Sequence, residues 1–407
     1  MIPVDAHRAT VAALMPAARR VRMRLAEAAG RALADDLRAP ISLPPFTNSS
    51  MDGYAVRAAE VHSGVTLPVA EDIPAGRTDA LVLAPGTAHR IMTGAPLPVG
   101  ADAIVPVEAT SGQGFDATHV CFTGDASAGQ FVRRAGSDIE AGEVALERGT
   151  VIGPAQVGLA AALGVPTVSV LAPLRVLVLS TGSELVTPGE PLSPGQIYES
   201  NSVMLAAAIR AAGADAESLR FVPDDVAHLR RVLGERLDAG DVDLVITSGG
   251  VSAGAYEVVK EAFTGGFADV DFVKVAMQPG MPQGAGHIVT PGRRRVPVVT
   301  LPGNPVSSLV SFEVFVREPL RAALGLPARR PRRTAVLAAG VQSIPGKRQF
   351  LRGALTSTDG NDSVIAVGGH GSHFLRWMAS ADCLIDIAPE VEEVVAGATV
   401  TVVPLAD

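Results

Sequence analysis

Three segments of the chain share one pattern: an apolar run, then serine or threonine, then glycine in a short turn. They are RVLVLSTGSEL (175–185), VDLVITSGGVSAG (242–254) and VPVVTLPGNPVSS (296–308). Continuous valine, isoleucine and leucine runs are typical of strands buried on both faces, and a helical pattern follows each segment. The sequence therefore predicts a parallel α/β sheet covered by helices, with the three loops together at the carboxyl ends of the strands.

These loops have the composition of an anion site. Glycines let backbone N–H groups approach an anion, and a helix start adds a positive dipole end. The loop TSGGVSAG matches neither G-x-x-x-x-G-K-[ST] nor G-x-G-x-x-G, and one glycine-rich turn after a strand is often only a turn. Because three occur together, we expect an oxyanion cradle formed by Thr181, Gly182, Ser248, Gly249, Gly250, Ser252, Pro302, Gly303, Asn304 and Pro305.

Carboxylates follow the same strands. Glu184 follows the first loop, Asp224 comes after another short strand, and Glu257 lies just past the second loop. Each has an ordinary alternative: Asp224 or its neighbour can cap a helix, and Glu257 can pair with Lys260 on a helix face. Gathered at one edge they are oxygen ligands of the kind that Mg²⁺ uses with substrate phosphates, and Lys274 is placed to neutralise an oxyanion.

Composition limits the class of protein. A chain of 407 residues predicts two to four domains of roughly 100 to 150 residues each. The formal net charge of -8 gives no positive field for nucleic acid or an anionic membrane. The two cysteines, Cys121 and Cys383, form no C-x-x-C pair, and the first residues do not resemble a secretory signal. We expect a cytoplasmic protein that binds neither membrane nor nucleic acid.

The amino-acid composition and the hydrophobic pattern change along the chain and predict four domains. Residues 9–37 are rich in alanine, leucine and arginine and predict helix, whereas short alternating runs such as HRIMTG and DAIVPVEAT predict strands. The predicted division is a helical connector domain (1–38 plus 140–172), an inserted β-rich domain (39–139), an α/β domain (173–326) and a C-terminal β domain (327–407).

Nine blocks in order along the chain resemble the signatures of molybdopterin molybdenumtransferases of the MoeA type, which are related to the E domain of gephyrin. The blocks are FTNSSMDGYAVR (46–57), RIMTGAPLP (90–98), FVRRAGSDIEAGE (131–143), LSTGSEL (179–185), GQIYESNS (195–202), TSGGVSAGAYEVVK (247–260), KVAMQPGMP (274–282), LPGNPVS (301–307) and GSHFLRWMASADCL (371–384). The resemblance implies a central molybdopterin-binding domain like that of MogA and MoaB, and a C-terminal β-barrel-like domain. It also implies a reaction in which adenylylated molybdopterin and molybdate give molybdenum cofactor and AMP, with Mg²⁺.

The resemblance also implies a homodimer whose active site is completed by the β-rich domain of the partner, and a substrate handed over by the molybdopterin adenylyltransferase. Matched positions imply roles for single residues: Ser248, Gly249, Gly250 and Ser252 in the pterin phosphate loop, and Pro302 and Pro305 in the turn that shapes the pocket. Glu184, Asp224 and Glu257 match acidic residues linked to metal and catalysis. The other matched catalytic positions are Asp52, Thr93, Lys274, Arg352 and Ser372.

The chain departs from the family pattern at three positions. Glu257 stands where many members have aspartate, one methylene shorter, and Gln278 and Met281 stand where some have lysines. Two other functions stay open. A different enzyme on the same pterin-binding fold would lack NSSMDGYAVR and the C-terminal β domain, and a non-catalytic pterin-binding scaffold or carrier would tolerate loss of Asp52, Glu184 and Lys274. The sequence does not decide between molybdate and tungstate, or between the main enzyme and a paralogue.

Overall fold

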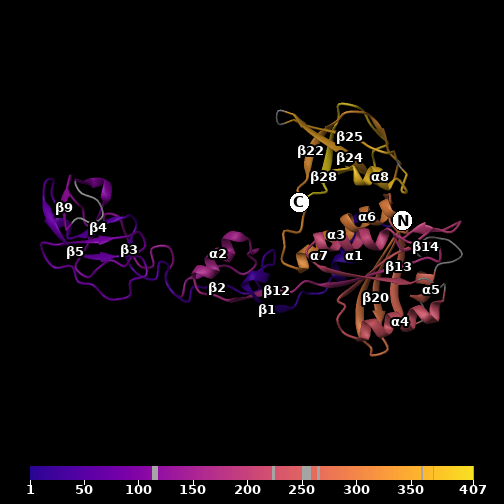
Figure 1. The fold of residues 1–407 in the computed structure, drawn as a ribbon. Coiled ribbons are helices and arrows are strands. Elements are labelled where there is room, and N and C mark those ends of the chain that lie inside the picture. Colours follow the sequence, from indigo (N-terminus) through magenta and orange to yellow (C-terminus); the bar gives the residue numbers. More distant parts are fainter. Residues whose placement is uncertain are drawn as a thin grey trace. The chain divides into compact units, whose positions relative to one another are not determined.

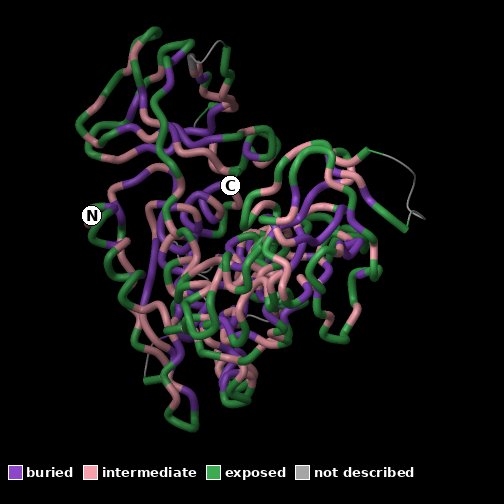
Figure 2. Tube along the Cα trace, turned by 90° about the vertical axis from the view of Figure 1, so that its left-hand side faces the viewer, coloured by how far each residue is buried: buried purple, intermediate pink, exposed green. Residues whose placement is uncertain are grey.

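The computed structural model describes residues 1–111, 118–221, 225–249, 258–263, 266–358, 361–369 and 371–406. The chain forms two compact units. The first, here called the α/β unit, contains Met1–Val21, Gly30–Ala32 and Val170–Asp407, and the second, the β unit, contains Arg22–Ala29 and Leu33–Ser169. Buried stretches, purple in Figure 2, alternate with exposed turns in both units.

A six-stranded sheet of order β16-β13-β17-β21-β20-β18 organises the α/β unit. The first four strands run parallel, whereas β20 is antiparallel to β21 and β18 is antiparallel to β20. The predicted parallel sheet is thus confirmed, with an antiparallel extension at one side. Its strands are β13 (Arg175–Thr181), β16 (Asp215–Phe221), β17 (Leu244–Ser248), β18 (Ala268–Lys274), β20 (Pro282–Val289) and β21 (Arg295–Leu301).

Helices cover both faces of this sheet (Figure 1). Val176 and Val178 of β13 point into one core, and Leu177 and Leu179 point into the other, as the period of two in a strand requires. The first face carries α1 (Val4–Leu14), α3 (Asn201–Ala211), α6 (Pro305–Ser311), the π-helical segment η4 (Phe312–Val316) and α7 (Arg317–Ala323). The second face carries α4 (Val226–Asp238) and α5 (Val258–Ala262).

A second six-stranded sheet in the α/β unit has the order β19-β24-β25-β22-β28-β26. It closes on itself because β24 also pairs with β26, which confirms the barrel-like C-terminal region. The strands are β19 (Met277–Gln278), β22 (Arg333–Leu337), β24 (Arg348–Thr358), β25 (Asn361–Ala366), β26 (Cys383–Ile387) and β28 (Thr399–Pro404), accompanied by β23 (Val341–Gln342), β27 (Glu393–Val394) and α8 (Leu375–Ala379). Phe350, Met378 and Leu384 belong to the same core as the helices on the first face of the α/β sheet.

The β unit is built on a sheet of order β7-β4-β6-β5-β9-β8. These strands are β4 (Gly53–Val56), β5 (Thr66–Ile73), β6 (Ala88–Ile91), β7 (Ala103–Pro106), β8 (Thr110–Ser111) and β9 (His119–Phe122). Two-stranded sheets pair β2 (Leu37–Arg38) with β11 (Val144–Leu146) and β3 (Asn48–Ser49) with β10 (Val132–Arg133). Short helices complete the unit: α2 (Pro154–Ala162), η1 (Leu25–Glu27), η2 (Ala58–Glu60) and η3 (Val107–Ala109).

The helix expected across residues 9–37 is wrong beyond Leu14. Arg20–Arg24 forms β1, which pairs with β12 (Thr167–Leu171). Pro16 lacks the N–H that would continue the helix, and arginines alternate with Val21 and Met23 in the period of a strand. No helix in the described part of the chain has the length and apolar character needed to cross a membrane.

Candidate active site at the strand ends

The three predicted loops meet at one edge of the α/β sheet. Ser180 lies opposite Ser248, and Ser248 lies opposite Leu301, so that β13, β17 and β21 end side by side. A cavity of about 730 Å³, here called the strand-end pocket, opens there. Its lining comes from the three loops, from the start of α3 and from the short strands β14 (Leu185–Val186) and β15 (Ile197–Tyr198), and it includes Thr181, Gly182, Glu184, Glu199, Asn201, Ser248, Gly249, Gly303, Asn304 and Pro305. The prediction that the loops share one edge is confirmed.

Asn201 joins the first turn of α3 to two of these loops. Its Nδ2 donates to Ser248 Oγ at 2.8 Å and to the carbonyl oxygen of Gly303 at 2.6 Å. The amide oxygen Oδ1 is buried and has no hydrogen-bond partner within the described residues. A buried acceptor of this kind is costly unless a donor reaches it, so Asn201 Oδ1 is a candidate contact for a ligand N–H group.

Glu199 is a buried carboxylate behind this asparagine, only 5% exposed. Its Oε1 accepts from Ser180 Oγ at 3.0 Å and from the backbone N–H of Ser202 at 2.8 Å. Its Oε2 accepts from Ser202 Oγ at 2.5 Å. These three bonds compensate the loss of hydration of the carboxylate and tie the end of β13 to the first turn of α3.

Gly249 and Gly303 bring the second and third loops into backbone contact. Gly249 has φ +96°, and a Cβ atom on Gly303 would lie 3.3 Å from the Cα of Gly249. Larger residues would therefore push the two loops apart. The Gly249 N–H donates to the carbonyl oxygen of Leu301 at 3.2 Å, so this amide, expected in the oxyanion cradle, holds the loop instead.

Lys274 lies at the same edge of the sheet but outside the strand-end pocket as far as the described residues define it. It is exposed and ends β18, which β20 separates from β21. Two strand spacings place it roughly 10 Å from the end of β21. Pro302 also does not appear in the described lining, but its carbonyl oxygen accepts from Ser248 Oγ at 3.4 Å.

Arg352 of β24 shapes a loop of the C-terminal barrel next to α6. It is 5% exposed and donates to the carbonyl oxygens of Gly371 at 2.9 Å and Gly368 at 3.2 Å, and also to that of Gly369. Burial lowers the pKa of its guanidinium from the usual value. Ser372 follows this loop, and its carbonyl oxygen accepts from the backbone N–H of Val306 at 3.3 Å, one residue beyond the pocket.

Asp52 and Thr93 are brought together in the β unit although 41 residues separate them. Asp52 Oδ1 accepts from the backbone N–H of Thr93 and from Thr93 Oγ1, both at 2.7 Å. The backbone hydrogen bond and then the hydroxyl hydrogen bond lower the pKa of the Asp52 carboxyl from its usual value. Both residues are exposed, so the pair is a preformed anionic surface group.

Known proteins resemble the chain over its full length. Molybdopterin molybdenumtransferase 2 of Mycobacterium tuberculosis is 56% identical over 409 residues, which cover 98% of each chain. The chain belongs to the MoeA family. Models of the MoeA N-terminal region (domain I and II), of a probable molybdopterin binding domain and of the MoeA C-terminal region (domain IV) match residues 2–164, 177–322 and 334–405.

More distant MoeA relatives have the same extent. Molybdopterin molybdenumtransferase of Haemophilus influenzae is 35% identical over 94% of this chain and 93% of its own. The crystal structure of a molybdopterin biosynthesis MoeA protein from Pyrococcus horikoshii superposes with a TM-score of 0.81 and 31% identity, covering 99% of both chains. These likenesses confirm the predicted family and its multidomain fold.

Four of the residues that the MoeA resemblance singles out lie outside the described residues: Asp224, Gly250, Ser252 and Glu257. The predicted metal set of Glu184, Asp224 and Glu257 therefore stays a prediction. Glu184 itself is an exposed carboxylate in the lining of the strand-end pocket. In the described part of the chain no three histidine, cysteine, aspartate or glutamate side chains gather as a metal site.

The sequence reasoning missed Glu199 and Asn201 as site residues. Both belong to GQIYESNS, and the one local signal was a serine and an asparagine directly before the apolar spacing of a helix, which reads as a helix cap. The asparagine side chain instead bonds to groups 47 and 102 residues away. No local pattern carries that information.

Proposed function

We propose that the strand-end pocket of this molybdopterin molybdenumtransferase binds adenylylated molybdopterin, and that molybdate insertion and AMP release take place there. The observation that carries the proposal is the buried Oδ1 of Asn201, which has no partner among the described residues, in a pocket of about 730 Å³ at the strand ends. A pterin ring system has amide and amino N–H donors, and this acceptor fits one of them. The cavity volume lies in the range of roughly 300–1,000 Å³ of small-molecule sites.

The proposed reaction in this pocket cleaves a phosphoanhydride bond, and negative charge develops on the phosphate oxygens during this step. The exposed Glu184 carboxylate is a hard oxygen donor, and with substrate phosphates it fits a Mg²⁺ ion. When bound there, Mg²⁺ would neutralise charge on the phosphate groups. Asp224 and Glu257 are the further proposed ligands, and Lys274, at the same edge of the sheet, is the proposed cation for the oxyanion or the leaving phosphate.

The proposed roles of the other matched residues follow from their contacts. Arg352 and Ser372 would position the start of α6 beside the pocket, since the loop that Arg352 holds contacts Val306. Asp52 and Thr93 are proposed to complete the site from a partner subunit in a homodimer, in line with their preformed anionic pair. The four-domain division and delivery of substrate by the adenylyltransferase belong to the same proposal.

The test is AMP release from adenylylated molybdopterin with Mg²⁺, with and without molybdate. Wild type should release AMP in a molybdate-dependent manner, and Glu184→Gln should lose this activity. Glu190→Gln is the matched control, because Glu190 is an exposed carboxylate on the same connection that does not line the described pocket. Tight pterin binding with no AMP release under any metal or oxyanion would contradict the catalytic proposal and leave a scaffold or carrier.

A further inference from the structure

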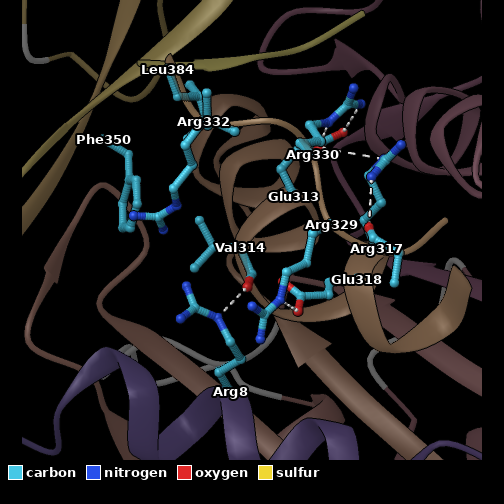
Figure 3. Close-up of a pocket in the computed structure, with 12 residues that line it drawn as sticks. Arg8, Glu313, Val314, Arg317, Glu318, Arg329, Arg330, Arg332, Phe350 and Leu384 are labelled. Carbon is cyan, nitrogen blue, oxygen red and sulfur yellow. Dashed lines mark hydrogen bonds and ion pairs between the residues drawn. The ribbon is translucent and has the colours of Figure 1, made fainter. Parts of the chain in front are cut away.

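A second cavity of about 490 Å³ lies within the α/β unit where α1, η4 and α7 face strands of the C-terminal barrel. Figure 3 shows its arginine side chains, and we call it the arginine pocket. No described residue lines both this cavity and the strand-end pocket. Glu313 lies eight residues after Pro305 on one continuous run of helix, so the two cavities are separated by roughly 12 Å or more along it.

The charge of the arginine pocket is opposite to that of the chain. Its described lining contains five arginines and two glutamates, although the whole chain has a formal net charge of -8. The arginines are Arg8, Arg317, Arg329, Arg330 and Arg332. A local excess of guanidinium groups in an acidic protein marks a place where an anion is attracted.

The two lining carboxylates are held by arginines. Glu313 accepts from Arg330 Nε at 2.8 Å and from Arg330 Nη2 at 3.3 Å. The Oε2 atom of Glu313 also lies 3.9 Å from Arg317 Nε. These three side chains are nearly buried. Glu318 accepts from Arg329 Nε at 3.0 Å. Dashed lines in Figure 3 mark these contacts, which fix the wall of the cavity in position.

Arg8 is fixed from α1. Its Nε donates to the carbonyl oxygen of Val314 at 3.2 Å, and its NH1 donates to Asp5 Oδ1 at 2.5 Å. Val314 belongs to η4, and a π-helical turn displaces backbone carbonyls from regular helical pairing, so that a partner outside the helix can reach them. Such segments are frequent at functional sites.

Arg332 contributes positive charge that its contact with Asp386 only partly offsets. Its NH1 lies 3.4 Å from Asp386 Oδ2, but Arg348 already donates to both oxygens of Asp386 at 2.7 Å. Arg348 also lies 3.5 Å from Asp5. When Asp5, Asp386 and Arg348 are counted with the lining, positive charges outnumber negative charges by two among the described residues.

The remaining lining is mainly apolar, with Val314, Phe350, Leu384 and Val403. Guanidinium groups bind phosphate through paired hydrogen bonds, and the volume is within the range of roughly 300–1,000 Å³ of small-molecule sites. We propose that the arginine pocket is a second ligand site, which binds a small phosphate monoester with an apolar or aromatic body, of the size of a nucleoside monophosphate. The guanidinium groups would bind the phosphate, and the apolar wall would contact the body.

The test is calorimetric titration of the full-length protein at low salt with AMP, inorganic phosphate and adenosine as probes. AMP should bind more tightly than phosphate, and adenosine should not bind measurably. Arg332→Ala should weaken AMP binding about tenfold, the effect of one lost charged hydrogen bond. Arg333→Ala is the matched control, because Arg333 is the adjacent exposed arginine and does not line the described cavity.

AMP is also the product proposed to leave the strand-end pocket, so the two sites must be separated. Asn201→Asp places a carboxylate in the strand-end pocket and should leave AMP binding at the arginine pocket unchanged. No AMP binding at millimolar concentration would overturn the proposal, as would binding that is lost in Asn201→Asp but unchanged in Arg332→Ala. If Arg8→Ala, as a second variant, unfolds, Arg332→Ala decides alone, because Asp386 keeps its Arg348 partner.

Discussion

The strand-end pocket and the arginine pocket each contain one glutamate largely shielded from solvent, Glu199 and Glu313, but the partners of the two carboxylates differ. Glu199 receives three hydrogen bonds from serine groups, none of which is charged. Glu313 is held by the guanidinium groups of Arg330 and Arg317. Neutral donors fix the loops of the first pocket without adding cations. Under the proposed function, Mg²⁺ at Glu184 and the Lys274 ammonium would balance the charge of its ligand. The ion-paired wall of the second pocket has cations in excess.

The largest effect is expected for Glu313→Gln. The substitution removes the charge that both nearly buried arginines contact, and breaking a buried pair by removing one partner costs about 3–5 kcal/mol. Thermal or denaturant unfolding would measure the loss. Glu318→Gln is the control, since its partner Arg329 is 87% exposed, and an exposed pair contributes about 0–1 kcal/mol. Equal effects of the two variants would contradict the assigned role of Glu313.

Glu199→Gln should destabilise the protein less, by about 1–3 kcal/mol. A glutamine amide keeps Oε1 as the acceptor for Ser180 and the Ser202 N–H, and its NH2 group can donate to the Ser202 hydroxyl, but all three bonds lose the added strength of a charged acceptor. Unfolding experiments measure the change, with Glu190→Gln as the exposed control. If Glu199→Gln lowered the free energy of unfolding more than Glu313→Gln does, the expectation that charged partners contribute more than neutral ones would be wrong.

Asn201→Ala is expected to act on the ligand more than on the fold. It removes the Oδ1 atom, for which the described residues offer no partner, and the two bonds to Ser248 and Gly303. One lost hydrogen bond to the ligand weakens pterin binding about tenfold. Binding of molybdopterin and kcat/KM for AMP release are the measurements. The control is Gln196→Ala, because Gln196 is an amide side chain near Asn201 that does not line the described pocket. The proposed contact is wrong if Asn201→Ala binds pterin like wild type.

The two pockets also differ in how far the sequence predicts them. The strand-end pocket follows from three buried strand patterns, because parallel strands must end at a common edge and the loops are continuous with them. Glu199 and Asn201 were not predicted as site residues, because the packing of α3 on that edge determines their hydrogen-bond partners. The arginine pocket was not predicted, since Arg8, Glu313 and Arg332 come from three separate parts of the chain and line one cavity only in the folded unit. The strand at Arg20–Arg24 was missed because alanine and arginine around it favour helix.

Asp52 is an exposed carboxylate that also has neutral donors, and its variants are expected to have the smallest effect on stability. The backbone N–H and then the hydroxyl of Thr93 lower the carboxyl pKa. A pKa that is lower in the folded chain stabilises the fold above the ordinary aspartate pKa, and this contribution disappears as the pH falls through the lowered value.

Thr93→Val removes the hydroxyl but keeps the backbone donor, so the Asp52 pKa should rise part of the way to its usual value, whereas Thr93→Ser should leave it lowered. A carboxyl titration followed by NMR measures both variants. Because solvent screens the two hydrogen bonds of this exposed carboxylate, global stability should hardly change. The three neutral donors around buried Glu199 should instead affect the stability of the whole fold. An Asp52 pKa unchanged in Thr93→Val would mean that the backbone N–H alone holds the carboxylate.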